Sequence, residues 1–337
     1  MVQQVSSTLQ CVLRIHFTAD DLARVSIAAE PDPLWEVLLS LHMVQGGDGA
    51  LMCGPWRRRT RDRFNGSDLR LLRDLAPPTG YSPDFLTPID AGPALEPAID
   101  RLLSTPRSRL RADLDYLATR QPPTIWTRAL AHGEPAALTR LGSAVRSYHD
   151  IALAPYWRSI RRHVVTDRAR RVEQLARHGV DHVLANLHPG VRWEPPVLQI
   201  FDFVDTDIHL GGRGLRLQPS FFCWQAPTKL RDITLAPVLV YPTQPPPGSL
   251  VRDGQPHTSS TLENLIGRTR ALVLEATVAG CTTTELARIC GISAGAASQH
   301  TAVLRNSALI TTRRDGLAVI HEITSLGLAL LDGATAA

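Results

Sequence analysis

Cysteine is scarce in this 337-residue chain, and no two of its five cysteines form a C-x-x-C pair. This pattern disfavours a disulfide framework, a zinc ribbon and a thioredoxin-like redox centre. Long hydrophobic runs are also missing, because no apolar stretch approaches the roughly 20 residues that a bilayer-spanning helix needs. We therefore expect no membrane partner.

Signals for export and for catalysis are missing as well. The segment Met1–Gln4 lacks a basic stretch followed by an apolar one, so the expected location is the cytoplasm. No H-E-x-x-H or Walker motif stands out, so we expect no enzyme, no catalytic residue and no cofactor. A catalytic site assembled from distant residues would leave no motif. An enzyme is therefore kept as an alternative hypothesis.

The composition and patterning indicate an α+β chain with several regions. Its net charge of +4 permits a polyanionic partner without requiring one. Residues 1–190 have mostly helical patterning, and residues 191–247 form a β-rich section packed on them. Residues 248–261 form a Pro-rich linker before a separate domain at 262–337. The mainly helical region is the candidate for dimerisation or effector binding.

Short local signals place elements near the N-terminus. Residues 13–17 alternate as a strand, and Thr18 is positioned to cap a short helix. Asp32, followed by proline, is typical of a helix start, and the apolar residues 34–44 predict that this helix is buried. Residues 77–97 are expected to form a long loop.

Arginine clusters are a second feature of this region. Residues 155–178 predict a long amphipathic helix with a cationic exterior. Its arginines either contact phosphate or an acidic ligand, or simply form a solvated face, and the same two alternatives hold for Arg57–Arg59. The helix carries Arg158, Arg161, Arg162, Arg168, Arg170, Arg171 and Arg177.

The β-rich section has strand signals separated by a glycine-rich turn. Strands are expected at 197–203, 215–217, 221–224 and 238–241. The turn at Gly211–Gly214 lacks the strand and helix that a dinucleotide fingerprint requires, so we expect no nucleotide site there.

Residues 262–337 hold the most specific pattern. Residues 265–276 predict a first amphipathic helix, and Thr282–Glu285 form a capping box for a second. A tight turn at Cys290–Ile292 leads to Ser293, which is a good N-cap for a third helix over 294–306. The order is helix, short turn, helix.

The N-terminal half of the third helix combines small and polar side chains. In a helix-turn-helix this part enters the major groove, where small residues allow close approach and polar ones contact base edges. Glutamine can pair with adenine through two hydrogen bonds, and serine can bind a base or a phosphate. The candidate DNA contacts on this helix are Ser293, Gly295, Ala296, Ser298, Gln299 and His300.

A hairpin signal follows the third helix. Residues 309–312 and 318–323 alternate as strands on either side of the favoured turn sequence Asp315-Gly316. A helix-turn-helix followed by a hairpin predicts a winged helix, whose wing can reach phosphates or a minor groove. The arginines expected to position phosphates are Arg268, Arg305, Arg313 and Arg314.

Several segments carry a family resemblance. Within 262–337 they are Gly267–Arg270, Thr283–Ala287, Gly291–Ser293, Ala297–His300, Val303–Arg305, Leu309–Ile310 and Arg313–Gly316. They resemble the DNA-binding domain of ArsR-type bacterial transcription regulators. The upstream stretches Ile15–Thr18, Pro31–Glu36, Gly212–Ser220 and Tyr241–Pro242 resemble the N-terminal region of a long actinobacterial subset of these proteins.

The resemblance implies a cytoplasmic homodimer that binds double-stranded DNA at a near-palindromic operator. The family's serine, arginine-or-glutamine and histidine positions correspond to Ser298, Gln299 and His300. The expected function is a repressor controlled by an unknown effector, and a small molecule bound by the N-terminal region is the candidate effector.

Many members of the resembled family sense metals, but this sequence does not favour metal sensing. Those relatives carry a C-x-C in the second helix of the motif, whereas only Cys290 lies there. A sensor built from Cys281, Cys290 and His300 remains a minor alternative. The cluster His178, Asp181, His182 and His188 is expected to be structural, because Gly179 breaks the helix between its histidines.

Three positions depart from the family pattern. Thr301 replaces a buried leucine, Leu317 replaces a wing arginine, and Ala308 replaces a glycine that ends the recognition helix. If position 308 needs a left-handed backbone, alanine costs about 1 kcal/mol there. Because residues 262–337 hold six arginines and six acidic residues, a winged-helix protein-interaction module without specific DNA binding is the alternative function.

Overall fold

The computed structural model has an α+β fold that divides into two compact units. Unit 1 comprises the described residues of Met1–Gly46, Phe64–Ala154 and Ile160–Gln244, and unit 2 those of Gly47–Arg63, Pro155–Ser159 and Pro245–Ala337. The structure describes residues 11–47, 49–63, 67–89, 92–245, 249–250, 252, 262–263, 265–315 and 318–333. Most of the predicted linker at 248–261, and the segment Met1–Gln4, lie outside them.

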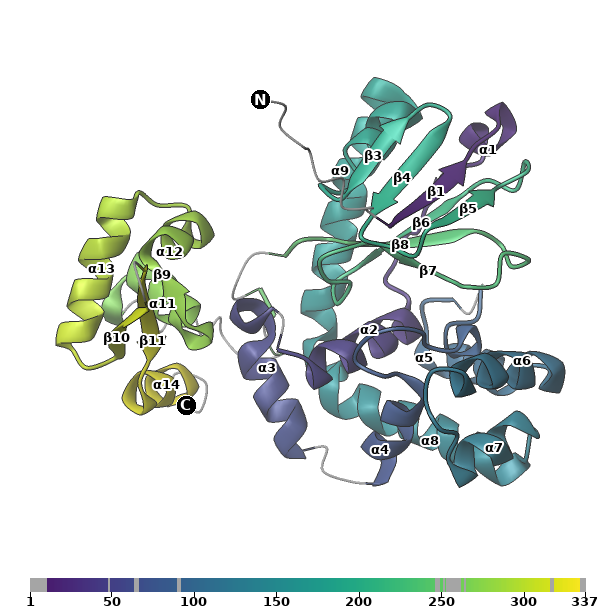
Figure 1. Cartoon of the computed structure of the whole chain (residues 1–337), viewed down its shortest axis with the longest axis horizontal. Helices are drawn as coiled ribbons and strands as arrows, with labels where there is room; N and C mark the ends of the chain where they lie inside the picture. Colours follow the sequence, from purple (N-terminus) through teal and green to yellow (C-terminus); the bar gives the residue numbers. More distant parts are fainter. Residues whose placement is uncertain are drawn as a thin grey trace, which may run out of the picture. The chain divides into compact units, whose positions relative to one another are not determined.

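Two four-stranded sheets form the β part of unit 1 (Figure 1). In the first sheet, β1 lies between an antiparallel partner, β4, and a parallel partner, β5. In the second, β6 lies between β2 and β8, parallel to both. The first sheet has the order β3 (Val191–Glu194), β4 (Val197–Phe201), β1 (Val12–His16), β5 (Thr206–His209). The second has the order β2 (Ser26–Ile27), β6 (Arg216–Ser220), β8 (Val238–Pro242), β7 (Thr228–Lys229).

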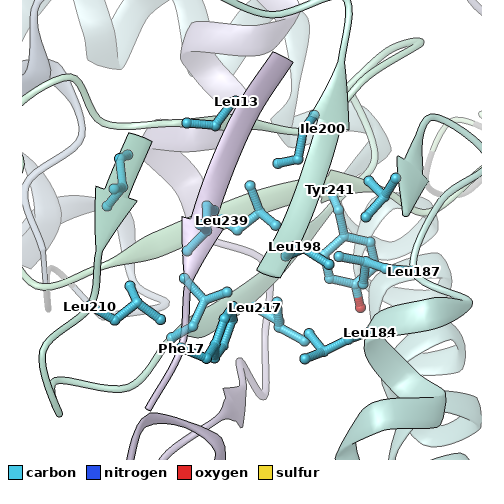
Figure 2. Packing of buried hydrophobic residues seen from close by; sticks show 14 of the residues in the cluster. Leu13, Phe17, Leu184, Leu187, Leu198, Ile200, Leu210, Leu217, Leu239 and Tyr241 are labelled. Atoms are coloured by element: carbon cyan, nitrogen blue, oxygen red, sulfur yellow. The ribbon is translucent and has the colours of Figure 1, made fainter. Parts of the chain in front are cut away.

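A hydrophobic core joins the two sheets. Figure 2 shows Leu13 and Ile200 of the first sheet facing Leu217 and Leu239 of the second. Leu184, near the end of helix α9, closes the cluster from the side. Since β1 and β2 come from the first 30 residues, the predicted β-rich section at 191–247 is completed by strands from the N-terminal region.

Helices make up the rest of unit 1. Helix α2 begins where expected, because Asp32 accepts hydrogen bonds from the backbone N–H groups of Leu34 and Trp35 at 2.9 and 3.1 Å. Its Glu36 is fully buried and accepts the N–H groups of two residues that follow β6. The helices are α1 (Ala19–Ala23), α2 (Pro33–Gln45), α4 (Ser67–Leu75), η1 (Asp84–Leu86), α5 (Leu95–Leu103), α6 (Arg107–Ala118), α7 (Ile125–Ala131), α8 (Pro135–Ala152) and, from Ile160, α9 (Trp157–Ala185).

The structure corrects two local expectations and confirms a third. Residues 221–224 are not a strand, because the backbone leaves β6 after Ser220, where its N–H groups bind a helix carboxylate. The predicted loop at 77–97 contains η1 and the first turn of α5. The break predicted at Gly179 is confirmed, because its φ of 80° and ψ of 177° are not helical, and the helical segment after it, to Ala185, carries the same label α9.

Unit 2 combines helices with a three-stranded sheet of order β10-β11-β9. Its core is formed by residues such as Val273, Leu286, Ala297, Leu304 and Ile310. The elements are α3 (Ala50–Arg63), α11 (Arg268–Ala276), η3 (Thr277–Ala279), β9 (Cys281–Thr282), α12 (Thr283–Cys290), α13 (Ala294–Asn306), β10 (Ile310–Asp315), β11 (Ala318–Ile323) and α14 (Ser325–Gly333), with η2 (Ala154–Tyr156) at the unit boundary. Among the described helices, none is long and apolar enough to cross a membrane.

Candidate nucleic-acid interface

Capping residues fix the start and the end of α12 and the start of α13. Thr282 and Glu285 form the predicted capping box at the start of α12, with Thr282 N–H donating to Glu285 Oε2 at 2.8 Å. Gly291 ends α12 in the left-handed conformation, with φ of 65°. Ser293 then begins α13, since its Oγ accepts the N–H of Ala296 at 3.1 Å. These caps hold the two helices in a compact pair.

Helix α13 separates a buried face from an exposed one. Ala297, Thr301 and Leu304 are buried against the core of unit 2. Ser298 and Gln299 are exposed. Exposed polar groups on a helix that follows a tight turn are free to meet base edges or phosphates.

The remaining predicted residues of α13 have different environments. Gly295 is exposed, and a Cβ added there would meet nothing closer than 3.9 Å, so its small size is not needed for packing. Ala296 and His300 are partly buried. Ser293 uses its hydroxyl as the helix cap, which places it as a structural residue at the edge of the exposed face.

Ala308 stands where the resembled family has a glycine. Its backbone is left-handed, with φ of 56°. The expected consequence is that Ala308→Gly raises the free energy of unfolding of unit 2 by about 1 kcal/mol. Ala302→Gly, in the middle of α13, is the control and should lower it by about 1 kcal/mol, because glycine costs helix stability there. Urea unfolding of the full chain measures both; equal signs for the two variants would contradict the prediction.

Strand β10 carries two of the arginines predicted to position phosphates, Arg313 and Arg314. Both are exposed, but Arg313 Nε donates to Glu322 Oε1 across the strand pair at 2.9 Å. A phosphate would have to compete with this carboxylate. The turn predicted at Asp315-Gly316 includes Gly316, which lies outside the described residues, as does Leu317.

The two other predicted phosphate contacts lie on helices. Arg268 is the first residue of α11, and Arg305 is in the last turn of α13, and both are exposed. Arg305 is near enough to β11 to lower the pKa of His321. The structure thus brings Arg305 toward the hairpin.

His321 is a functional candidate that sequence reasoning did not single out. It is 3% exposed, and its ring nitrogens lie 3.0 Å from the hydroxyls of Thr283 on α12 and Thr312 on β10. It therefore connects the first helix of the pair to the hairpin. No clear sequence signal marks it, because residues 318–320 are all apolar and residues 321 and 322 are both polar.

Acid is expected to loosen unit 2 through His321. Burial and the charge of Arg305 lower its pKa from 6.5 in the folded state, so below pH 6.5 the unfolded chain binds a proton that the folded chain does not. The free energy of unfolding then falls as the pH drops. Hydrogen exchange of α12 and β11, corrected for the intrinsic pH dependence, should accelerate between pH 7 and pH 5. His321→Gln is expected to flatten this dependence, and an unchanged slope would contradict the assignment.

The cysteines of unit 2 do not have the character of a sensor. Burial raises the pKa of both Cys281 and Cys290, and the Sγ of Cys281 donates to the carbonyl of Ala276 at 3.2 Å. In the described part of the chain, no three His, Cys, Asp or Glu side chains converge on a point where a metal ion would fit. His300 thus belongs to no such group of three among these residues.

The second candidate metal cluster is occupied by structural contacts. Asp181 accepts the indole N–H of Trp193 at 2.8 Å, and His188 Nδ1 accepts the N–H of Gly190 at 3.0 Å. The rings of His178 and His182 pack with their centroids 4.7 Å apart. All four side chains therefore have structural contacts within the protein.

Three arginines of the predicted clusters make structural contacts within the protein. Arg161 forms a two-hydrogen-bond pair with Glu30 at 2.6 Å. Arg171 is buried and donates to the carbonyls of Asn186 and Leu187, so it is not on a cationic exterior as predicted. Arg57 is likewise buried, and it donates to the carbonyl of Gly47.

The segment Gly291–Gly295 also matches the pattern G-x-S-x-G. In a nucleophile elbow the serine follows a strand and projects from a strained turn. Here helix α12 precedes the segment, and the Ser293 hydroxyl accepts a backbone N–H as a helix cap. The match therefore has a structural explanation that needs no catalysis.

Comparisons with models of protein families, with curated proteins and with solved structures found no match for this chain.

Proposed function

We propose that this chain is a sequence-specific DNA-binding transcription regulator whose residues 262–337 act as a winged helix-turn-helix of the ArsR type. The single observation that carries the proposal is the exposed Ser298–Gln299 edge of α13, directly after a capped turn. The antiparallel hairpin β10–β11 that follows supports a wing, since its residues pair from Ile310 with Ile323 to Asp315 with Ala318.

In this function the residues divide into two roles. Gln299 and Ser298, with His300 beside them, would contact base edges, and Gly295 and Ala296 would let the helix approach the groove. Arg268, Arg305, Arg313 and Arg314 would position phosphates. A cytoplasmic homodimer would place two such helices on a near-palindromic operator, repress the adjacent gene and respond to an effector through unit 1.

Fluorescence anisotropy of the full chain tests the proposal. The probes are DNA from upstream of its own gene and a scrambled duplex, each at several salt concentrations. A specificity ratio above about 1000 is expected for a regulator. Equal, weak binding to both duplexes that disappears with salt would contradict it. Two chains per duplex are expected if the dimer is correct.

A protein-interaction module is the second candidate, and the Arg313–Glu322 pair is the observation that favours it. This pair neutralises a wing arginine in a region with as many acidic residues as arginines. Such a surface has a modest attraction for a polyanion.

Glu322→Gln separates the two candidates. If the wing contacts phosphate, removing the negative charge of Glu322 should strengthen binding to every DNA sequence several-fold and steepen its salt dependence. Arg111→Ala, which removes an exposed charge from unit 1, is the control and should change neither quantity. Unaltered DNA binding in Glu322→Gln would favour the protein-interaction module.

A further inference from the structure

An open cleft in unit 1 lies between the first half of helix α6 and the segment that connects β7 to β8. Its volume, about 530 Å³, is within the range of small-molecule sites. Each side of the cleft contributes one arginine and one aspartate. Arg109 and Asp113 come from α6, and Arg231 and Asp232 come from the connecting segment.

The two aspartates are engaged in contacts within the protein. Asp113 is buried, and its Oδ2 accepts the backbone N–H of Phe85 at 2.9 Å. Asp232 Oδ1 accepts the N–H and the hydroxyl of Thr234 at 2.9 and 2.7 Å. These carboxylates therefore stabilise the walls of the cleft.

The two arginines, by contrast, keep donors for a ligand. Both are exposed, and the acidic atom nearest to Arg109 is Asp232 Oδ2 at 3.9 Å, which is too far for a hydrogen bond. Among the described residues, no carboxylate comes within 4.0 Å of Arg231, whose guanidinium lies 3.6 Å from the ring centroid of Tyr116. A stacked guanidinium still presents the N–H groups at its edge to an acceptor.

The position of Arg231 is fixed by buried neighbours. The carboxylate of Asp84 accepts the backbone N–H groups of Arg231 and Asp232 at 3.0 and 2.7 Å. Tyr116, which carries the guanidinium on its face, packs edge-on against Tyr81 with ring centroids 4.7 Å apart. Because the backbone and the side chain of Arg231 are both held, a ligand would find this donor already in place.

Two guanidiniums on opposite sides of one cleft favour a phosphate group. A guanidinium binds phosphate through two parallel hydrogen bonds, and a phosphate has enough oxygens to accept from two such groups at once. Ile233, which is 60% exposed, adds an apolar surface to the same cleft.

We propose that this cleft binds a small organic phosphate monoester, with its phosphate on Arg109 and Arg231 and its organic part against Ile233. The cleft belongs to unit 1, so this binding does not depend on DNA. Only a role of the ligand as the effector rests on the proposed function.

Isothermal calorimetry of the full chain with phenyl phosphate tests the proposal. We expect saturable binding with one ligand per chain, and we expect inorganic phosphate to compete for it. Benzoate has the same ring with a smaller anionic group and should bind at least about fivefold more weakly. Absence of saturation, or equal affinity for benzoate and phenyl phosphate, would overturn the proposal.

Substitutions on α6 locate the site. Arg109→Met keeps an unbranched apolar stem and should weaken phenyl phosphate binding at least about tenfold, because it removes charge-assisted hydrogen bonds. Arg111→Met is the matched control on the same helix, since Arg111 pairs with Asp115 and does not line the cleft. The control should leave the affinity unchanged. Equal affinity for Arg109→Met and the native chain would overturn the proposal.

Asp232→Asn provides a test in the opposite direction. It removes the negative charge 3.9 Å from Arg109, and the amide oxygen can still accept hydrogen bonds from Thr234. Phenyl phosphate should therefore bind several-fold more tightly to this variant. Unchanged or weaker binding would overturn the proposal, whatever the result with DNA.

Discussion

Replacement of Gln299 by alanine is expected to reduce the discrimination between preferred and scrambled DNA by about 10- to 100-fold, since a bidentate glutamine–adenine contact contributes about 1–3 kcal/mol. The exposed amide of Gln299 lies on the face of α13 opposite the buried Ala297, Thr301 and Leu304. Its loss leaves no buried group unpaired, so folding should be unaffected. The affinity for scrambled DNA should therefore stay nearly constant.

The measurement is anisotropy against a duplex selected from random sequence and a scrambled partner. Asn306→Ala is the matched control, because it changes an exposed polar residue at the far end of the same helix. Arg314→Ala should weaken binding to both duplexes alike and lower the salt slope by about 1. If Gln299→Ala and Arg314→Ala lose affinity in the same way, the division between base and phosphate contacts is wrong.

Gly214→Ala is expected to destabilise unit 1 by about 3 kcal/mol or more. Gly214 has φ of 74°, and a Cβ there would lie 2.5 Å from the backbone oxygen of Arg24. Its N–H also donates to the buried carboxylate of Asp21 at 2.9 Å. Because the obstructing atom is backbone, the turn and the end of α1 would have to move apart.

Gly212→Ala provides a close control for this prediction. Gly212 also has a positive φ, of 84°, but the nearest atom to its added Cβ is a side-chain nitrogen of Arg24 at 3.9 Å. Alanine there should cost only about 1 kcal/mol, from backbone strain alone. Urea unfolding followed by tryptophan fluorescence measures both variants. A similar loss in the two would show that close approach does not determine the cost at Gly214.

Local chemistry explains which elements were predictable. The capping residues Thr18, Asp32, Thr282 and Ser293 each begin a helix where the sequence indicated. A cap is a hydrogen bond between residues two or three apart, so its signal is contained in a few neighbouring letters. The left-handed backbone of Ala308 was raised only as a condition that came with the family resemblance, because alanine itself is no signal for a positive φ.

Pairing between distant segments explains what was missed. The central place of β1 between β4 and β5 depends on residues almost 190 positions away. The burial of Arg171 depends on the carbonyls of Asn186 and Leu187 in a later turn. An amphipathic pattern of arginines does not predict these hydrogen bonds. The ion pair of Arg313 with Glu322 follows from hairpin register, which alternation alone leaves open.

The amino-acid sequence by itself determined the α+β character of the chain, the starts of α1, α2, α12 and α13 and the polar edge of α13, because these depend on short-range hydrogen bonds and on hydrophobic periodicity. Only the tertiary structure decided that the first strands complete the two sheets of unit 1 and that His321 joins α12 to the hairpin. Contacts between distant residues set the burial and hydrogen-bond partners of these groups, and burial is what changes the chemistry of a titratable side chain.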